Sequence, residues 1–219
     1  MGKRDCPSFP FSFRDCPCVS YLLLFDSVQG MMMTGYREIK RKYCGRRITM
    51  EFREVIKNRY SCKKFSDRQV EKEKLEAILN AGRLAPTAKN LQEQHIYVVQ
   101  SAEALAKIDA VTPCRYGAPT VLVVAFDKNN VFTYPGGKRD SGVEDATIVA
   151  THMILAAADE GIDSCWINFL DPEILAQTLG LPENEEILMV MDLGYAAEGA
   201  GPLPNHDSRK PLTETVVYM

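Results

Sequence analysis

Three side chains that could bind a phosphate group alternate in one short stretch of this chain. Arg59, Ser61 and Lys63 occupy every second position of the segment 58–65. In an extended backbone, such alternation places all three side chains on one face. A guanidinium, a hydroxyl and an ammonium group together form a good receptor for a phosphate dianion. Taken alone, such a stretch is more often a solvated basic turn, so its interpretation depends on the rest of the chain.

The composition is that of a globular protein with an acidic body. The chain has 219 residues, enough for one large domain or two small ones. Residues 1–49 carry nine Lys or Arg and four Asp or Glu, whereas residues 50–219 carry 17 and 25. Non-specific nucleic-acid binding needs a basic face, so we expect no nucleic-acid partner.

The sequence predicts neither a membrane anchor nor a metal centre. The longest apolar candidate, residues 19–25, ends at Asp26 and is too short to span a bilayer. No clean cleavage site for a signal peptide follows it. The seven Cys are scattered, and His95, His152 and His206 lie far apart, so a zinc site is not expected. Only three Cys fall in residues 50–219, which is ordinary for reduced thiols and favours a cytoplasmic location.

The chain divides into an atypical N-terminal extension and a folded body. Residues 1–49 cluster Pro, Cys, Met and basic residues without a sustained period of 3.6 or 2. The folded unit is expected to cover residues 50–219, beginning with a helical turn whose apolar face holds Phe52, Val55 and Ile56. The extension could be a poorly ordered tail, a targeting segment or translated upstream sequence.

Helices and strands alternate irregularly along the body, which favours a mixed α/β sandwich over a doubly wound sheet. A capping box at residues 66–69 predicts a helix soon after it. Expected helices are 71–84, 101–109, 142–160 and one from Pro172 that ends at Gly180. Expected strands are 96–99, 120–126, 163–169, 187–193 and a short one at 216–217. Cys165 falls in one of these apolar strands, which is typical of a buried structural thiol.

Four segments, in this order and at these separations, resemble the nitroreductase family of FMN-dependent oxidoreductases. They are residues 59–65, 85–92, 161–167, and 193–198 with 208–212 behind it. The resemblance covers residues 50 to about 217 and leaves residues 1–49 without a counterpart. It implies an α+β fold, a three-layer α/β/α sandwich with a mostly antiparallel central sheet. It also implies a homodimer with FMN bound at the interface.

The resemblance further implies which residues bind FMN. The first motif, with an Arg near the C-terminus, would hold the phosphate; these residues are Arg59, Tyr60, Ser61, Lys63 and Arg209. A loop from the partner subunit would reach the flavin, through Pro86, Thr87, Ala88, Asn90 and Gln92. The loop after the Trp-containing strand would lie against the ring, at Ile167, Asn168 and Phe169.

Two positions depart from the pattern of similar proteins. Many of these continue the second motif as Gln-Pro-Trp, whereas this chain has Gln92, Glu93 and Gln94. Many also carry a cation two residues before the C-terminal Arg, where this chain has Asp207. We therefore expect phosphate binding to depend more on Arg59, Lys63 and Arg209.

The activity that the resemblance implies is hydride transfer from NADH or NADPH to FMN N5, then to a quinone, nitroaromatic or similar acceptor by a ping-pong mechanism. The flavin would carry the redox chemistry, so no catalytic side chain is expected. The alternatives are a non-catalytic flavin carrier or sensor, a specialised flavin chemistry such as dehalogenation, and an interaction domain without a cofactor. The short segment 128–142 disfavours dehalogenation, because that branch usually carries an added lid.

Overall fold

A four-stranded antiparallel sheet organises the part of the chain that the computed structural model describes, residues 50–219. Its strand order is β1 (Gln94–Val99), β2 (Thr120–Asp127), β4 (Glu185–Gly194) and β3 (Asp163–Ile167). The central pair, β2 and β4, is buried almost throughout, which explains its continuous apolar runs. The predicted N-terminal extension, residues 1–49, lies outside the described residues.

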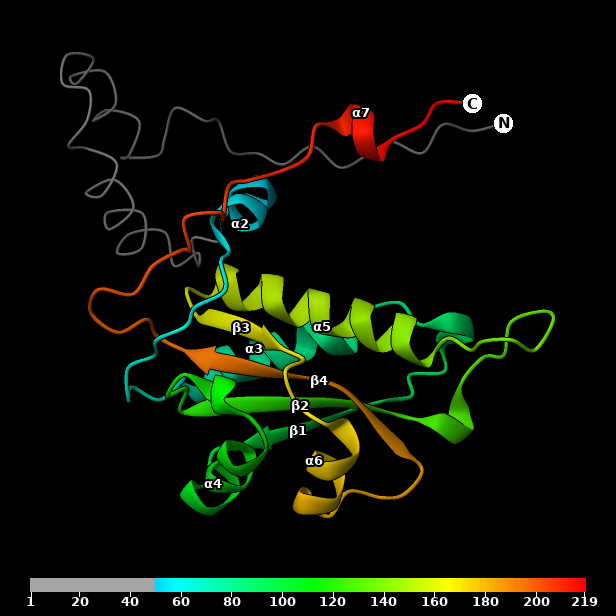
Figure 1. The fold of residues 1–219 in the computed structure, drawn as a ribbon, viewed down its shortest axis with the longest axis horizontal. Helices are drawn as coiled ribbons and strands as arrows, with labels where there is room; N and C mark the ends of the chain where they lie inside the picture. Colours follow the sequence, from blue (N-terminus) through cyan, green and yellow to red (C-terminus); the bar gives the residue numbers. More distant parts are fainter. Residues whose placement is uncertain (1–49) are drawn as a thin grey trace, which may run out of the picture. The chain divides into compact units, whose positions relative to one another are not determined.

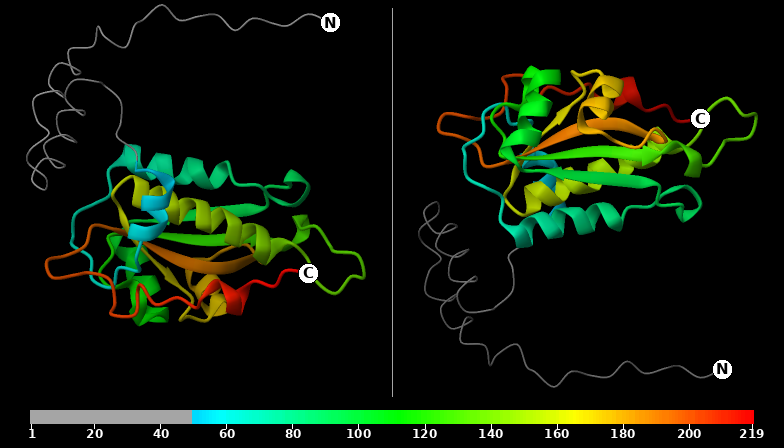
Figure 2. Two further views of the ribbon diagram at one scale, coloured as in Figure 1. Left: turned by 90° about the horizontal axis from the view of Figure 1, so that it is seen from above. Right: turned by 90° about the horizontal axis from the view of Figure 1, so that it is seen from below.

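Helices cover both faces of this sheet and complete a three-layer α/β/α sandwich (Figures 1 and 2). On one face lie α3 (Lys72–Arg83) and α5 (Gly142–Asp159), and on the other lie α4 (Ala102–Val111) and α6 (Pro172–Leu179). The predicted α+β class and antiparallel sheet are therefore confirmed. The remaining helices are α2 (Phe52–Asn58) and α7 (Leu212–Thr215), with short 3-10 turns at Ala88–Asn90, Pro113–Arg115 and Lys128–Asn130.

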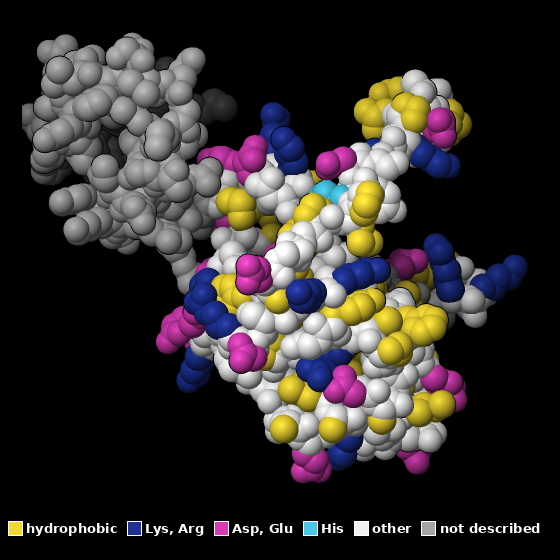
Figure 3. Space-filling model, turned by 60° about the vertical axis from the view of Figure 1, so that its left-hand side comes forward, with side chains coloured by type: hydrophobic (Ala, Val, Ile, Leu, Met, Phe, Trp, Pro, Cys, Tyr) yellow, Lys and Arg dark blue, Asp and Glu magenta, His cyan; other side chains and the backbone are white. Residues whose placement is uncertain are grey.

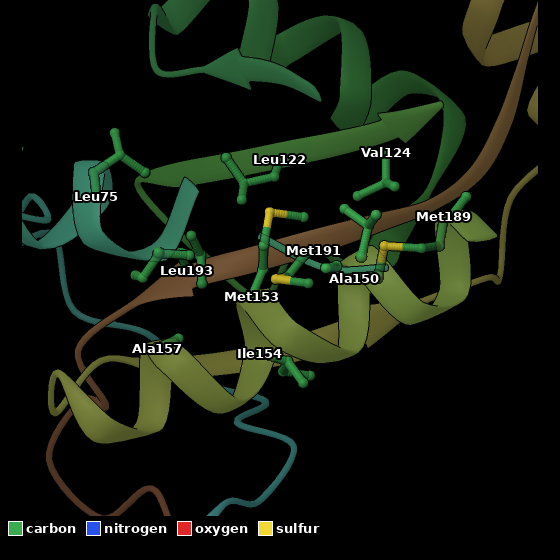
Figure 4. Close-up of a cluster of buried hydrophobic side chains, with 14 of the residues drawn as sticks. Leu75, Leu122, Val124, Ala150, Met153, Ile154, Ala157, Met189, Met191 and Leu193 are labelled. Carbon is green, nitrogen blue, oxygen red and sulfur yellow. The ribbon is translucent and has the colours of Figure 1, made fainter. Parts of the chain in front are cut away.

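Alternation along β2 divides the interior into two cores. Leu122 and Val124 point toward α3 and α5, where Met153 fills the space between sheet and helix (Figure 4). Val121 and Val123 point to the opposite face and pack with residues of α4 and α6. Each such side chain contributes roughly 1.5–3 kcal/mol when it is fully removed from water. Both faces of the sheet are thus held by apolar packing, so the sheet is a rigid base for the segments at its ends.

Small residues bring α5 close to its neighbours. Gly82 of α3 leaves room for Met153, because a Cβ there would lie 2.8 Å from the Met153 Cγ. Gly142 at the start of α5 lies against the ring of Phe126, and a Cβ would meet that ring at 2.3 Å. The first turn of α5 is therefore locked against the end of β2.

Three local predictions are wrong, and a tertiary contact explains the first of them. The hydroxyl of Ser66 donates to the carbonyl of Tyr195 and does not cap a helix. The helix predicted over 71–84 is nevertheless present as α3, with Glu71 at its N-cap. Phe52 and Ile56 are 63% and 52% exposed, so only Val55 of the predicted apolar face is buried.

The predicted strand at residues 216–217 is also wrong. These residues follow the short helix α7 and lie outside every strand of the described chain. The strand predicted over 163–169 ends at Ile167, so residues 168 and 169 belong to the loop that follows it. Among the described helices, none combines the length and apolar character that a membrane crossing requires.

Candidate functional site

The phosphate-binding candidates lie on an extended segment that crosses the ends of two strands. Ser61 forms a parallel bridge with Ser164, and the Cys62 N–H donates to the Ser164 carbonyl at 2.9 Å. Further along, Phe65 forms an antiparallel bridge with Ala196 after β4. Cys62 is fully buried, so its neighbours Ser61 and Lys63 point to the opposite, accessible side. The alternation expected from the sequence is thus present for Ser61 and Lys63.

Ser61 and Lys63 open onto a pocket of about 280 Å³. Its other walls come from the turn before β2 and from the end of β3; they are Cys114, Tyr116 and residues 165–169. The Lys63 ammonium lies 5.8 Å from the centre of the Tyr116 ring. On the face that Figure 3 shows, Lys and Arg side chains lie next to hydrophobic ones. The pocket therefore joins a cationic end to an aromatic and apolar wall.

Two hydrogen bonds fix the loop after β3 at the edge of this pocket. The indole N–H of Trp166 donates to Asn168 Oδ1 at 2.7 Å, and the Thr112 hydroxyl donates to the Phe169 carbonyl at 2.7 Å. Phe169 itself is 73% exposed. Ile167, Asn168 and Phe169 thus lie on the same pocket as Ser61 and Lys63.

Arg59 and Tyr60 line a second, smaller hollow of about 180 Å³. It lies between the end of α2 and the turn after α5, beside Asp163. Burial is the main cause that raises the pKa of the Tyr60 hydroxyl, and Asp163 raises it further. Arg59 therefore does not share a pocket with Lys63 in a single chain.

The C-terminal segment passes beside this first motif. The rings of Tyr60 and His206 meet edge to face, with their centres 6.4 Å apart. The Arg209 guanidinium donates to the carbonyls of His206 and Ser208, so it is folded onto its own backbone. The chain thus brings Arg209 into the region of Tyr60 without directing it into either hollow.

The loop of residues 86–92 lies at the opposite end of α5 from Lys63. The Ala88 N–H donates at 2.9 Å to Asp145, in the first turn of α5. Ser61, by contrast, pairs with Ser164, which follows the last turn of α5. An 18-residue helix is about 27 Å long. The two predicted parts of the cofactor site therefore do not meet within one chain.

This loop is held in a strained conformation. Lys89, Asn90 and Gln92 have φ of 51°, 56° and 54°, a left-handed region that costs a residue with a side chain about 1–3 kcal/mol. The Gln92 N–H donates to Thr87 Oγ1 at 3.1 Å, and the Asn130 amide donates to the Leu91 carbonyl at 3.2 Å. The loop is thus shaped before any partner or ligand arrives.

The two buried thiols beside the pocket, Cys62 and Cys165, are poor nucleophiles. Cys165 is 2% exposed, and burial, helped by Asp192, raises its pKa to about 11. Burial also raises the pKa of the Cys62 thiol. Since a thiolate is the reactive species, both groups are inert thiols at neutral pH. This agrees with the interpretation of Cys165 as a structural residue.

Asp192 is a feature of this region that the sequence analysis missed. It is fully buried in β4, and neither carboxyl oxygen has a hydrogen-bond partner in the described chain. Burial raises its pKa to about 9, so the group is neutral at pH 7. In its ionised form it raises the pKa values of Tyr116 and Cys165, both of which line the larger pocket. An acid within the apolar run 187–193 was the signal that could have identified it.

Comparisons with known sequences find related proteins over most of the described chain. A sequence profile described as the nitroreductase family matches residues 56–112 and 113–195. A protein of Archaeoglobus fulgidus, named as a candidate NADH dehydrogenase/NAD(P)H nitroreductase, is 34% identical over 149 residues. The match covers 64% of this chain and 83% of that protein.

Solved structures give the same result. A nitroreductase family protein from Clostridium difficile 630 is 37% identical, with a TM-score of 0.72, over 77% of this chain and 98% of its own. A nitroreductase from Bacteroides fragilis NCTC 9343, whose structure contains bound FMN, is 29% identical, with a TM-score of 0.62. That match covers 78% of this chain and 100% of the other.

Replacing Asp192 by Asn should remove a pH-dependent cost of folding. The pKa of this carboxyl group is raised in the folded state to about 9. The unfolding free energy of the protein therefore falls as the pH rises toward that value, because the unfolded chain releases the proton more readily. The asparagine does not titrate, so its advantage in unfolding free energy should grow by up to about 1.4 kcal/mol per pH unit between about pH 5 and 8. Urea unfolding across this range measures it, with exposed Asp207→Asn as control. Parallel curves for D192N and the unmodified protein would contradict the assignment.

Proposed function

Because this chain belongs to the nitroreductase family, we propose that it is an FMN-dependent oxidoreductase that uses NADH or NADPH to reduce a quinone, a nitroaromatic compound or a similar acceptor. When bound, FMN would supply the redox chemistry, taking hydride at N5 and passing it to the acceptor in ping-pong order. The pocket that joins Ser61 and Lys63 to residues 167–169 is the observation that carries this proposal.

The residues of this pocket suit the two ends of such a cofactor. The Lys63 ammonium and the Ser61 hydroxyl are donors for a phosphate, and no carboxylate lines the pocket beside them. Tyr116, Trp166 and Ile167 form a wall against which a flat ring could stack. Among the described residues, no hydrogen bond engages the N–H groups of Asn168 and Phe169, so both are available to a ligand.

We assign Arg59 and Arg209 supporting roles at the phosphate end. Each lies on a segment next to that end, and each has a flexible side chain that a phosphate could attract. The Arg209 guanidinium bonds only to backbone carbonyls, which it could leave without breaking an ion pair. Tyr60 would keep the two segments together through its contact with His206.

The complete site would form between two copies of the chain. The pocket of one chain, about 280 Å³, is below the roughly 300–1,000 Å³ typical of ligand pockets. The loop of residues 86–92 points away from it, at the other end of α5. Apolar side chains suited to an interface are exposed on α2 and α5: Phe52, Ile56, Val143 and Ile148. In a homodimer, Pro86, Thr87, Ala88, Asn90 and Gln92 of one chain would complete the pocket of the other.

The proposed acceptor range and location follow from the same features. Stacking and shape, rather than a set of directed hydrogen bonds, would select acceptors on the apolar wall, so the range should be broad. Cys62, Cys114 and Cys165 are free thiols, which supports a reducing compartment such as the cytoplasm.

The first test of this function is optical. Purified protein with FMN should show a bound-flavin absorbance band that disappears on anaerobic addition of NADH or NADPH and returns when a quinone is added. A band that neither nucleotide bleaches would instead indicate a flavin carrier. A protein that binds no FMN at all would contradict the proposal.

Lys63→Met should weaken FMN binding by about 10- to 100-fold, because a hydrogen bond to a charged group contributes about 1.5–3 kcal/mol. Lys64→Met is the matched control, since Lys64 is the next residue along the chain but lies on the other face, where its ammonium donates to the Glu198 carbonyl. Fluorescence titration with FMN measures both variants. Equal affinities of K63M and K64M for FMN would show that Lys63 is not part of the binding site.

Mixed dimers should test whether each site uses two chains. We expect Lys63→Met and Asn90→Ala to impair FMN binding as homodimers. In a mixed dimer of the two, one site would take Lys63 from the N90A chain and the loop from the K63M chain, and both parts would be intact. Unfolding and refolding the two variants together should therefore restore FMN binding in mixed dimers to about half of the sites. If co-refolding restores none, both parts of the site come from the same chain.

A further inference from the structure

Two buried carboxyl groups meet beneath the loop of residues 86–92. Glu93, just before β1, is 1% exposed, and Asp145, in the first turn of α5, is 5% exposed. Asp145 acts directly on the Glu93 carboxyl group, so the two side chains are neighbours. They are far apart in the sequence, so the fold places them together.

Neither carboxyl group has enough hydrogen-bond donors. Both oxygens of Glu93 and Oδ2 of Asp145 lack a partner, and neither residue forms an ion pair within residues 50–219. Two buried carboxylates in contact would repel each other and lose their hydration. A single proton between them supplies the missing donor and removes one of the two charges. The geometry therefore favours a protonated Glu93 that donates to Asp145.

Charged groups on the surrounding elements do not neutralise this pair. Lys89 lies over the Phe132 ring, 4.4 Å from its centre. Asp127, whose N–H donates to the Glu93 carbonyl, has a carboxylate that accepts from Asn184. The other groups on the surrounding elements are His95, which pairs with Glu185, and Lys128, Tyr134, Lys138, Arg139, Asp140 and Glu144. Of these, Arg139 and Tyr134 both pair with Glu144, and Asp140 accepts from the Gly142 N–H.

The pair is connected directly to the loop. Oδ1 of Asp145 accepts the Ala88 N–H at 2.9 Å, which attaches the loop to α5. The next residues, Lys89 and Asn90, have left-handed backbone conformations that this attachment helps to hold. A second negative charge at Glu93 would push Asp145 away from this position. The state of the carboxyl pair and the shape of the loop are therefore coupled.

We propose that Glu93 is a positioning residue, whose proton, shared with Asp145, holds the loop of residues 86–92 in the shape that binds FMN. The inference rests on the proposed function, because the loop is assigned there to the partner's cofactor site. It adds a regulatory property to that site: loss of one buried proton would weaken the binding of the cofactor.

The direction of the pH effect follows from the burial of the pair. Burial and the neighbouring Asp145 raise the pKa of Glu93 to about 7. A raised pKa means that the shared proton is present below about pH 7 and is lost as the pH rises through that value. FMN affinity should therefore be higher in mildly acidic solution and fall in mildly alkaline solution.

The experiment measures the FMN dissociation constant of four proteins from about pH 6 to about pH 8.5. They are the unmodified chain, Glu93→Gln, Asp145→Asn and the exposed control Glu183→Gln. In E93Q the amide donates to Asp145 without titrating, and in D145N the amide donates to Glu93 while its oxygen still accepts from Ala88. Ionisation of the FMN phosphate is common to all four proteins and cancels in their ratios.

We expect the dissociation constant of the unmodified chain and of E183Q to rise about 10-fold or more across this range, with E93Q and D145N changing much less. The same pH slope in E93Q and the unmodified chain would overturn the proposal. If none of the four proteins binds FMN at any pH, the proposed function fails. The conformation of the loop is then followed directly, by measuring hydrogen exchange at the Ala88 amide. Protection lost at high pH in the unmodified chain but kept in E93Q would support the positioning role, and equal loss in both would refute it.

Discussion

The extended segment between α2 and α3 is the constraint on which the candidate site depends. Its backbone is tied to β3 through the Cys62 N–H and the Ser164 carbonyl. It is tied to the chain after β4 by two further bonds, one from Ala197 to the Lys64 carbonyl and one from Ser66 to Tyr195. With both ends fixed, alternation leaves no choice of face: Cys62 enters the core and Lys63 faces outward. A basic sequence that could have been a solvated turn thereby becomes one wall of a pocket.

Much of the fold could be predicted because its local patterns agree with its packing. Two such local patterns are the apolar runs of β2 and β4. Another is the pair of capping residues of α6, Asp171 at its start and Gly180 at its end. Predictions failed where a distant partner decided the outcome. The Ser66 hydroxyl donates to the Tyr195 carbonyl, far along the chain, and therefore does not cap the helix as expected. The exposure of Phe52 has no local signal, because sequence periodicity identifies an apolar face but not what covers it.

The candidate site was predicted in its parts rather than in its arrangement. Spacing alone indicated that Ser61 and Lys63 share a face, and the resemblance to a family placed residues 167–169 beside them. Sequence could not show that Arg59 lines a separate hollow or that Asp192 lies buried behind the pocket. Nor could it pair Glu93 with Asp145, since buried carboxyl groups look like surface acids until the fold is known. Such unpaired acids reduce stability, and they occur here beside the segments assigned to function.

The length of α5 has a consequence for how this protein can vary. The helix begins beneath the loop of residues 86–92 and ends beside the segment that carries Ser61, so it sets the spacing between them. One residue inserted in its middle would turn one end about 100° relative to the other and move it by about 1.5 Å. Insertions and deletions should therefore be tolerated in the exposed turn around Gly136 and rejected within α5, whose length fixes the separation of the two segments.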